Sequence, residues 1–314
     1  MLSRTAENLF WLARYVERAE YIARTIDATL RVTALPAAYI GKTNEWESAL
    51  LTAGASRSFY DTYAEANEHN VVEYLSFNPA NPSSIRNCIE QARLNSRAVR
   101  TALTVDMWSA LNETWMRVRE KLSPSLEGEQ LAESLEWIKE RSQLFSGAYN
   151  STMLRNDAYF FTRLGTFLER ADNTARILDV KYHVLLPQDE GVGGAMDYYQ
   201  WQAILRSVSA LRGYHWVYQD RLKPWLVAEL LILRPEMPRS LLSCYQQIME
   251  YLDLLAQAYG GKRGECHRFA GELYARLRYG RIQDIFQAGL HEFLTEFIER
   301  STRLGDAIGK LYLT

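Results

Sequence analysis

Apolar residues recur at helical spacing along almost the whole 314-residue chain. In the first long segment, residues 6–30, the apolar side chains fall on one side of a helix that turns about 100° per residue. That apolar face consists of Leu12, Tyr15, Val16, Ala19, Ile22, Ala23 and Ile26. The same spacing occupies residues 83–103, 105–122, 129–154, 156–185, 196–211, 238–259, 265–278 and 281–314. Because no segment shows sustained alternation of apolar and polar residues bounded by hairpin turns, the pattern predicts an all-α fold.

Three polar residues stand where helices are expected to begin. Ser3 is followed by Glu7, Ser83 follows Pro82, and Asn156 opens the pattern at 156–185. Side chains of these types accept hydrogen bonds from the free N–H groups of a first helical turn. We therefore expect helices to begin beside these three residues.

The sequence of the first long segment recurs in the second half of the chain. Residues 12–27 read LARYVERAEYIARTID and residues 164–179 read LGTFLERADNTARILD, with identity at seven of sixteen positions. Unrelated helices would share about one identity in such a window. The match continues in order through two tryptophans, a Pro-x-x-Pro-x-Ser motif, a cysteine and a Glu-Arg-Ser tripeptide. These pairs are Trp46 and Trp201, 79–84 and 235–240, Cys88 and Cys244, and 140–142 and 299–301.

The repeat predicts a tandem-duplicated helical bundle. The first copy covers residues 1–152 and the second covers residues 153–314. No tether rich in Gly, Ser or Pro lies between them, and such a tether is typical of independently moving domains. We therefore expect the copies to pack as one body, related by a pseudo-twofold axis.

The repeated helix carries a stripe of charged residues beside its apolar face. Four side chains share a narrow arc in each copy, and one arginine in each copy points about a quarter turn away. The arcs comprise Glu17, Glu20, Arg24 and Asp27 in the first copy and Glu169, Asp172, Arg176 and Asp179 in the second, and the two other arginines are Arg18 and Arg170. One interpretation is a set of solvated or interhelical salt bridges. The other is that the two stripes face each other across the axis and line a polar cleft.

The residues around this stripe resemble a known family. The opening Leu2-Ser3-Arg4, the segment Glu7 to Trp11, Arg14-Tyr15 and Glu17-Arg18-Ala19-Glu20 are similar to the bacterial α-E domain proteins, as is the segment at 81–93. That family is all-helical, carries a Glu-Arg motif and is typically duplicated. The second copy departs from the opening signature, because Arg163 replaces Trp11 and Thr166 replaces Arg14. We therefore expect the two halves not to be functionally equivalent.

The resemblance implies partners rather than an activity. Proteins of this family are linked to circularly permuted ATP-grasp ligases, transglutaminase-like proteins and a proteasome-like peptidase, in a system of peptide synthesis or modification. On that basis the chain is expected to be a non-catalytic scaffold, or a partner that presents substrate to the ligase. The alternative is an enzyme subunit in which Glu17 or Glu169 acts as acid or base and the arginines bind a carboxylate or acyl phosphate. A purely structural bundle without ligand is the third hypothesis.

Composition and charge exclude several other classes. There are 36 Lys and Arg against 38 Asp and Glu, so the chain lacks the basic surface by which proteins bind nucleic acid. The most apolar run, 225–233, is too short to span a membrane and contains Glu229. Three cysteines without paired spacing and a beginning without a signal-peptide pattern lead us to expect a cytoplasmic protein.

Candidate chemistry outside the stripe is sparse. None of the five histidines belongs to a Glu-x-x-His pair, so a ferritin-like metal site is not expected. No glycine-rich phosphate loop precedes a Lys-Ser/Thr pair, and no cofactor is expected. Cys88 and Cys244 stand at matching apolar positions, where cysteine serves as a small core residue. Two aromatic groups, at 198–201 and 214–216, are candidate anchors for a protein interface.

Overall fold

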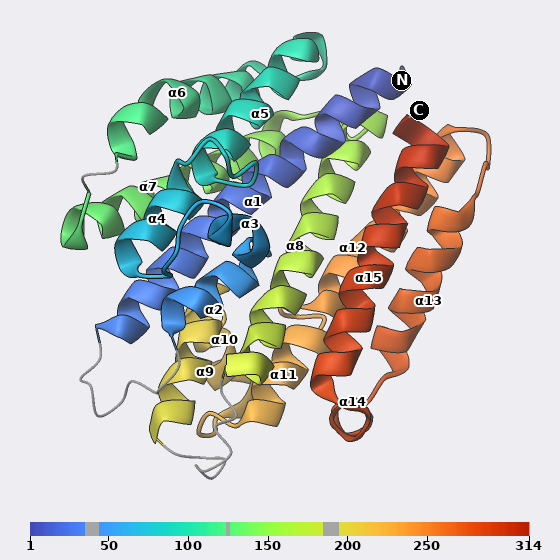
Figure 1. The fold of residues 1–314 in the computed structure, drawn as a ribbon. Coiled ribbons are helices and arrows are strands. Elements are labelled where there is room, and N and C mark those ends of the chain that lie inside the picture. The colour runs from blue at the N-terminus through green and yellow to red at the C-terminus, as the bar shows by residue number, and fades with distance from the viewer. Residues whose placement is uncertain (35–43, 124–125, 185–194, 314) are drawn as a thin grey trace.

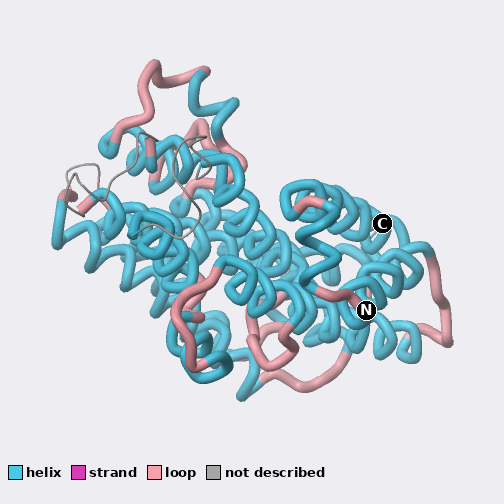
Figure 2. Tube along the Cα trace, turned by 90° about the horizontal axis from the view of Figure 1, so that it is seen from below, coloured by secondary structure: helices cyan, strands magenta, loops and turns pink. Residues whose placement is uncertain are grey.

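The chain folds into a bundle of α-helices joined by loops, and the described residues contain no strand (Figures 1 and 2). The computed structural model describes residues 1–34, 44–123, 126–184 and 195–313, with the side chains of 180–184 and 195–197 excepted. The prediction of an all-α fold is confirmed. The helices of the first half are α1 (Ser3–Thr33), α2 (Glu45–Thr52), α3 (Ser56–Tyr60), α4 (Glu68–Ser76), α5 (Ile85–Ala98), α6 (Val105–Lys121) and α7 (Gly128–Thr152), with a 3-10 turn at Arg100–Ala102. Those of the second half are α8 (Asp157–Val184), α9 (Ala195–Ser207), α10 (Leu211–Tyr218), α11 (Pro224–Leu233), α12 (Leu241–Ala258), α13 (Glu265–Tyr279), α14 (Ile282–Ala288) and α15 (Leu290–Ile308), followed by a π-helical turn at Gly309–Leu313.

The two long helices α1 and α8 lie side by side at the centre of the molecule and run in the same direction (Figure 1). Their backbones come close together at Gly165, where a Cβ atom would lie 2.2 Å from the carbonyl oxygen of Phe10. Ala13, the residue that matches Gly165 in the repeat, lies at the same crossing. The small residues therefore allow the helices to come close enough for their charged stripes to meet.

Each long helix is flanked by a set of three helices in the same order. In the first half, α5 and α7 pack against α1, and α6 packs against both of them. In the second half, α12 and α15 pack against α8, and α13 packs against both (Figure 1). This order is the one that the repeat leads us to expect, and the duplication itself stays a prediction from the sequence.

The shorter helices α2 and α9 connect the two halves at the end of the α1–α8 pair that lies opposite the two chain termini (Figure 1). α9, from the second half, packs against α1, and α2, from the first half, packs against α8. The C-terminal turn at Gly309–Leu313 also packs against α1, which places the two ends of the chain near each other (Figure 1). The halves therefore exchange contacts along the whole length of α1 and α8.

Helices begin at or within two residues of all three expected starts, although only Asn156 caps its helix with its side chain. Oδ1 of Asn156 accepts hydrogen bonds from the backbone N–H of Ala158 and Tyr159, at 3.1 and 3.4 Å, and caps α8. α1 begins at Ser3, which is its first residue and not its cap. α5 begins two residues after Ser83, and the neighbouring Ser84 caps it.

The pattern at 281–314 does not form one helix. It is interrupted between α14 and α15 by Gly289, whose φ of 98° is incompatible with a helix and costs least in glycine. The short helices α2, α3, α4, α10 and α11 were not predicted individually. Among the described residues, no helix is long and apolar enough to cross a membrane.

Candidate functional site

The charged stripes of α1 and α8 face each other along the contact between these helices. Glu17 and Glu169 are 3% and 2% exposed, so both carboxylates are buried in the interior. Each is bound by two arginines. We call these six residues the Glu-Arg clasp: Arg14, Glu17, Arg18, Glu169, Arg170 and Arg239.

Glu17 is bound by two arginines of the second half. Arg170 donates through Nε to Oε1 at 2.9 Å and through Nη2 to Oε2 at 2.8 Å, a bidentate arrangement. Arg239, from the segment between α11 and α12, donates through Nη1 to Oε1 at 2.7 Å. The planar guanidinium suits this geometry, because its N–H groups match both oxygens of a carboxylate.

Glu169 is bound in turn by two arginines of the first half. Arg18 donates to its Oε1 at 2.6 Å and its Oε2 at 3.1 Å, and Arg14 donates to Oε2 at 2.8 Å. Arg14 also lies over the ring of Trp11, 4.7 Å from its centroid. In both cases, therefore, a buried carboxylate of one half is neutralised by the other half.

The electrostatic balance of the clasp keeps both carboxylates ionised. Burial raises the pKa of Glu17, but the charges of Arg170 and Arg239 outweigh it and lower that pKa to about 2. Burial likewise raises the pKa of Glu169, and Arg18 and Arg14 lower it to about 2. A general acid or base acts best with a pKa near the working pH, so these environments do not suit that role.

Glu20 extends the clasp by one helical turn. Its carboxylate is 3% exposed and accepts hydrogen bonds from Arg24 at 2.7 Å, Arg239 at 2.6 Å and Ser142 at 2.6 Å. Arg239 therefore bridges the carboxylates of Glu17 and Glu20. Arg24 also donates a hydrogen bond through Nη1 to Oγ of Ser209 in the second half, at 2.8 Å.

The three remaining acids of the stripes pair within their own halves. Asp27 accepts from Lys139 of α7 and Asp179 lies 2.6 Å from Nδ1 of His291 in α15. Asp172 pairs with Arg176 four residues on, at 2.7 Å. The Asp172 and Asp27 carboxylates are 18% and 17% exposed, so these pairs lie nearer to solvent than the clasp.

The structure brings Glu17, Arg18, Glu169 and Arg170 of the predicted stripes into one contact, with Glu20 and Arg24 beside it. Asp27, Asp172, Arg176 and Asp179 lie outside that contact, and two partners that sequence reasoning did not select belong to it. Arg14 was noted as part of the family signature and as a departure from the repeat, and Arg239 was not singled out. Their matching positions hold Thr166 and Ser83, neither of which carries a charge. A change of charge between otherwise matching positions was the signal that could have found them.

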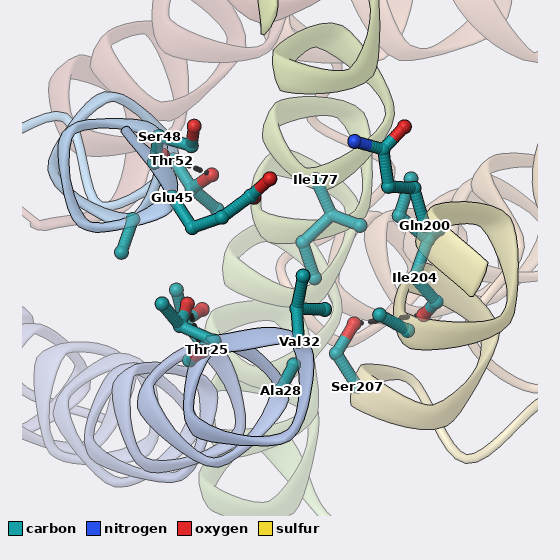
Figure 3. Close-up of a pocket in the computed structure, with 13 residues that line it drawn as sticks. Thr25, Ala28, Val32, Glu45, Ser48, Thr52, Ile177, Gln200, Ile204 and Ser207 are labelled. Atoms are coloured by element: carbon teal, nitrogen blue, oxygen red, sulfur yellow. Dashed lines mark hydrogen bonds between the residues drawn. The ribbon is translucent and has the colours of Figure 1, made fainter. Parts of the chain in front are cut away.

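A separate pocket lies between α1, α2, α8 and α9, beyond the clasp (Figure 3). Its cavity volume is about 90 Å³, and none of the ten stripe residues lines it. Five hydroxyl side chains and Glu45 face it from several helices. The hydroxyl residues are Thr25, Thr29, Ser48, Thr52 and Ser207.

The described cysteines are not activated as nucleophiles: Sγ of Cys266 lies 3.4 Å from Nδ1 of His267, but burial raises the pKa of that thiol to about 11. Cys88, Cys244 and Cys266 are unpaired and buried. Burial raises the pKa of the Cys88 and Cys244 thiols to about 12, which removes the reactive thiolate at neutral pH. No group of three or more His, Cys, Asp or Glu side chains in the described ranges could hold a metal ion.

Comparison with known proteins identifies the family. A family model described as a predicted alpha-helical domain with a conserved ER motif, named Alpha-E, matches residues 1–313. The chain belongs to the Alpha-E family. In this Alpha-E protein, the dipeptides Glu17-Arg18 and Glu169-Arg170 form the centre of the clasp, whereas Glu140 and Glu299, which also precede an arginine, are exposed.

The Alpha-E chain is also similar to longer mycobacterial proteins. Uncharacterized proteins of Mycobacterium bovis and of Mycobacterium tuberculosis strain CDC 1551 are each 25% identical to it, over 94% of this chain. A protein of M. tuberculosis strain H37Rv is 24% identical over the same share. The matching region covers 35% of each relative, so the chain spans about a third of their length. No solved structure matches the chain.

Proposed function

We propose that this Alpha-E protein is a non-catalytic cytoplasmic partner of an ATP-grasp-type peptide ligase, which it holds or to which it presents substrate. Transglutaminase-like and proteasome-like proteins are further partners of the same peptide synthesis or modification system. The observation that carries the non-catalytic role is the saturation of Glu17 and Glu169 by four arginines. The ligase is proposed as the partner on the basis of the family resemblance.

The same saturation speaks against the alternative of an active cleft. An acid or base must reach the proton that it transfers, and both oxygens of each clasp carboxylate already accept hydrogen bonds from arginine. The arginines are held in the same way, so a substrate carboxylate would have to displace a buried glutamate. The clasp is better suited to fixing the relative position of the two halves.

An exposed aromatic surface provides a site for the ligase. Trp216 on α10 is 83% exposed, and Trp225 on α11 and Tyr198 on α9 are 46% and 40% exposed. These helices contact one another at one end of the molecule (Figure 1). Of the two aromatic groups expected to supply anchors, Tyr198 and Trp216 are therefore accessible, while Trp201 and Tyr214 are buried.

The charge of this surface indicates the chemistry of its partner. Residues 198–225 contain four basic residues and one acidic residue, whereas the whole chain has a net charge of −2. Tryptophan and arginine are enriched in binding hot spots, and Lys223 lies over the ring of Trp225, 5.9 Å from its centroid. We infer that an acidic surface of the ligase covers this end. The basic residues are Arg206, Arg212, Arg221 and Lys223, and the acidic residue is Asp220.

The length of the mycobacterial relatives supports a role beside another protein. In those relatives the matching sequence is joined to about twice its own length of further sequence, given its 35% share. A module that works next to other sequence in one polypeptide can work next to a separate partner in another.

The test is co-purification of the full chain with an ATP-grasp-type peptide ligase. Trp216→Ala combined with Trp225→Ala is expected to weaken the complex by at least about tenfold, because buried tryptophan anchors dominate binding energy. Met116→Ala, at a 62% exposed position on α6, is the matched control and is expected to change affinity by less than about twofold.

Two results would contradict the proposal. A complex that survives every aromatic and stripe substitution, or the absence of any complex, would count against the scaffold role. If Glu169→Gln left fold and complex intact but stopped product formation in the reconstituted ligase mixture, the enzyme-subunit alternative would replace it.

A further inference from the structure

We propose that the outer face of α5 and α6 binds an acidic α-helix of a partner protein. This face belongs to the first half of the chain and lies away from the aromatic surface of α9, α10 and α11 (Figure 1). It can therefore be tested without the proposed ligase. Its centre is formed by two pairs of arginine and tryptophan, which we call the Arg-Trp ladder: Arg93 with Trp115, and Arg100 with Trp108.

Each arginine of the ladder lies over the ring of its tryptophan. Cζ of Arg93 is 3.8 Å from the centroid of Trp115, and Cζ of Arg100 is 4.4 Å from that of Trp108. Contacts at these distances are cation–π interactions. The two tryptophans are seven residues apart on α6, so they lie on the same face, separated by about 10.5 Å along the helix axis.

The arginines of this face have no acidic partner in the chain. Within the described ranges, the side chains of Arg93, Arg100 and the neighbouring exposed residues Arg97 and Arg119 form no ion pair. α5 carries three arginines and a single acid, Glu90. The face is thus positively charged in a chain whose net charge is −2. This charge favours an acidic partner.

Glu113 is the acid of α6 that is nearest in sequence to Trp115, and it is bound elsewhere. Its carboxylate pairs with Arg117 four residues on and with Arg141 of α7, at 3.5 and 2.9 Å. It therefore leaves the charge of the ladder uncompensated.

The stacked arginines keep hydrogen-bond donors for a ligand. Arg93 donates through Nε to Oδ1 of Asn112 at 3.3 Å, which fixes the orientation of its guanidinium. An arginine has five N–H donors, and a pair of them matches the two oxygens of a carboxylate. Because stacking already holds the side chain, less conformational freedom is lost when a carboxylate binds.

The second half packs the matching helices without these arginines. In the register of the two matching cysteines, Arg93 corresponds to Met249 and Arg97 corresponds to Asp253, both on α12. α12 nevertheless packs against α13, as α5 packs against α6. Helix packing therefore does not require the arginines, which favours a role for them in recognition.

The spacing of the ladder favours a helical partner. Residues seven apart on one α-helix face the same way and differ by about 10.5 Å in height, which is also the separation of the two tryptophans. A helix that lies along α6 can therefore bring two carboxylates to the two arginines at once. Leu94, which follows Arg93 and is 45% exposed, offers such a helix an apolar contact.

The test is isothermal titration calorimetry of the full chain with a synthetic helical peptide. The probe has about 21 residues of alanine and glutamine, long enough to form a helix, and two glutamates seven residues apart. We expect saturable binding. A peptide of the same composition with its glutamates nine residues apart, and so on opposite faces, should bind at least about tenfold more weakly.

Variants of the chain locate the site. Arg93→Gln combined with Arg100→Gln is expected to weaken binding of the probe at least about tenfold. Arg278→Gln combined with Arg303→Gln removes the same charge from exposed positions on α13 and α15, and should leave the affinity within about twofold. Thermal unfolding establishes that each variant is folded.

Arg93→Lys combined with Arg100→Lys separates recognition by a stacked guanidinium from attraction by charge. This variant keeps both charges but loses the planar fork, so its affinity should fall at least about fivefold. The proposal is overturned if the wild-type chain gives no saturable binding, if both peptides bind equally, or if the folded lysine variant binds like the wild type. Tighter binding of single-stranded oligothymidine than of the probe would also overturn it, in favour of a nucleic-acid site.

Discussion

Glu17 and Glu169 each place a negative charge in the interior of the protein, and each depends on the opposite half for its compensation. Removing a carboxylate from water costs several kcal/mol, which close hydrogen-bonded partners of opposite charge offset. The clasp meets that condition, because Glu17 receives three arginine hydrogen bonds of 2.7–2.9 Å. The contribution of the clasp to the free energy of unfolding is therefore best measured by replacing one of its charged residues.

Substitution Glu17→Gln should reduce the free energy of unfolding by about 3–5 kcal/mol, because it leaves Arg170 and Arg239 without their common counter-charge in a buried site. Chemical denaturation with urea measures the change. Glu299→Gln is the matched control, since Glu299 also precedes an arginine but is exposed on α15. Equal stability of the two variants would show that the clasp carries no structural role.

The clasp also makes stability depend on acid. The pKa values of Glu17 and Glu169 are lowered to about 2 in the folded chain, below the ordinary 4.5. Their contribution is therefore fully present above pH 4.5 and is lost as the pH falls from there toward 2. Denaturation midpoints measured from pH 7 to pH 2.5 should fall more steeply in the wild type than in Glu169→Gln. Parallel curves would contradict this assignment.

At the residue scale, the sequence was sufficient to find the acids but not all of their partners. The helical angle placed Arg18 and Arg170 a quarter turn from the acids of their own helix, and the neighbouring helix explains why they nevertheless bind glutamate. Arg239 could not be placed, because its contact depends on how a segment 222 residues from Glu17 returns to α1. The spacing of apolar residues in the sequence describes one helix at a time, whereas the clasp forms between two helices.

At the element scale, the contact between α1 and α8 depends on a small residue. Gly165 lies where a Cβ atom would come within 2.2 Å of the Phe10 carbonyl oxygen, which no side chain can accommodate without movement of the helices. The obstacle is backbone rather than a flexible side chain. Any larger residue at position 165 would therefore push α1 and α8 apart and separate their two charged stripes.

Substitution Gly165→Ala should destabilise the protein by about 1–3 kcal/mol, the usual cost of overpacking, despite the higher helix propensity of alanine. Gly147→Ala tests the opposite case, since Gly147 lies inside α7, where an added Cβ atom would meet no neighbouring atom within 4 Å. There we expect a gain of up to about 1 kcal/mol. Thermal unfolding of both variants measures the difference, and a stable Gly165→Ala protein would refute the close crossing.

The longer helices were easier to predict from the sequence than the shorter ones. The long helices α1, α8 and α12 repeat the apolar spacing over many turns, so their faces were evident. Helices such as α3, with five residues, are too short for a period to be recognised. The end of α14 was not predicted, because the apolar spacing continues across Gly289. The positive φ of Gly289, which interrupts the helix, is not visible in that spacing.

At the scale of the whole molecule, the described contacts join the halves on both sides of the long helix pair. α2 and α9 each pack on the long helix of the other half, and Glu17 and Glu169 each take their arginines from the other half. Neither half can bury its own glutamate without an uncompensated charge. Length alone would suggest two domains, and these contacts favour a single cooperative unit.

Division of the gene between α7 and α8 tests that unit. Residues 1–153 and 154–314 expressed alone should be insoluble or lack fixed tertiary packing, and co-expression should recover a soluble complex. Near-ultraviolet circular dichroism and sedimentation measure both outcomes. Two monomeric fragments that each unfold cooperatively would show that the halves are independent domains.

The origin of the arginines also governs when the protein can fold during its synthesis. Glu17 is made early, whereas Arg239 follows 222 residues later. At about 5–20 residues per second, the ribosome needs roughly 11–44 s to add the intervening chain. During that interval α1 cannot settle into its final surroundings, because Glu17 lacks Arg239 throughout and lacks Arg170 for the first 153 residues of it. The nascent first half must therefore wait, with its apolar faces accessible to chaperones, until α12 begins to leave the exit tunnel.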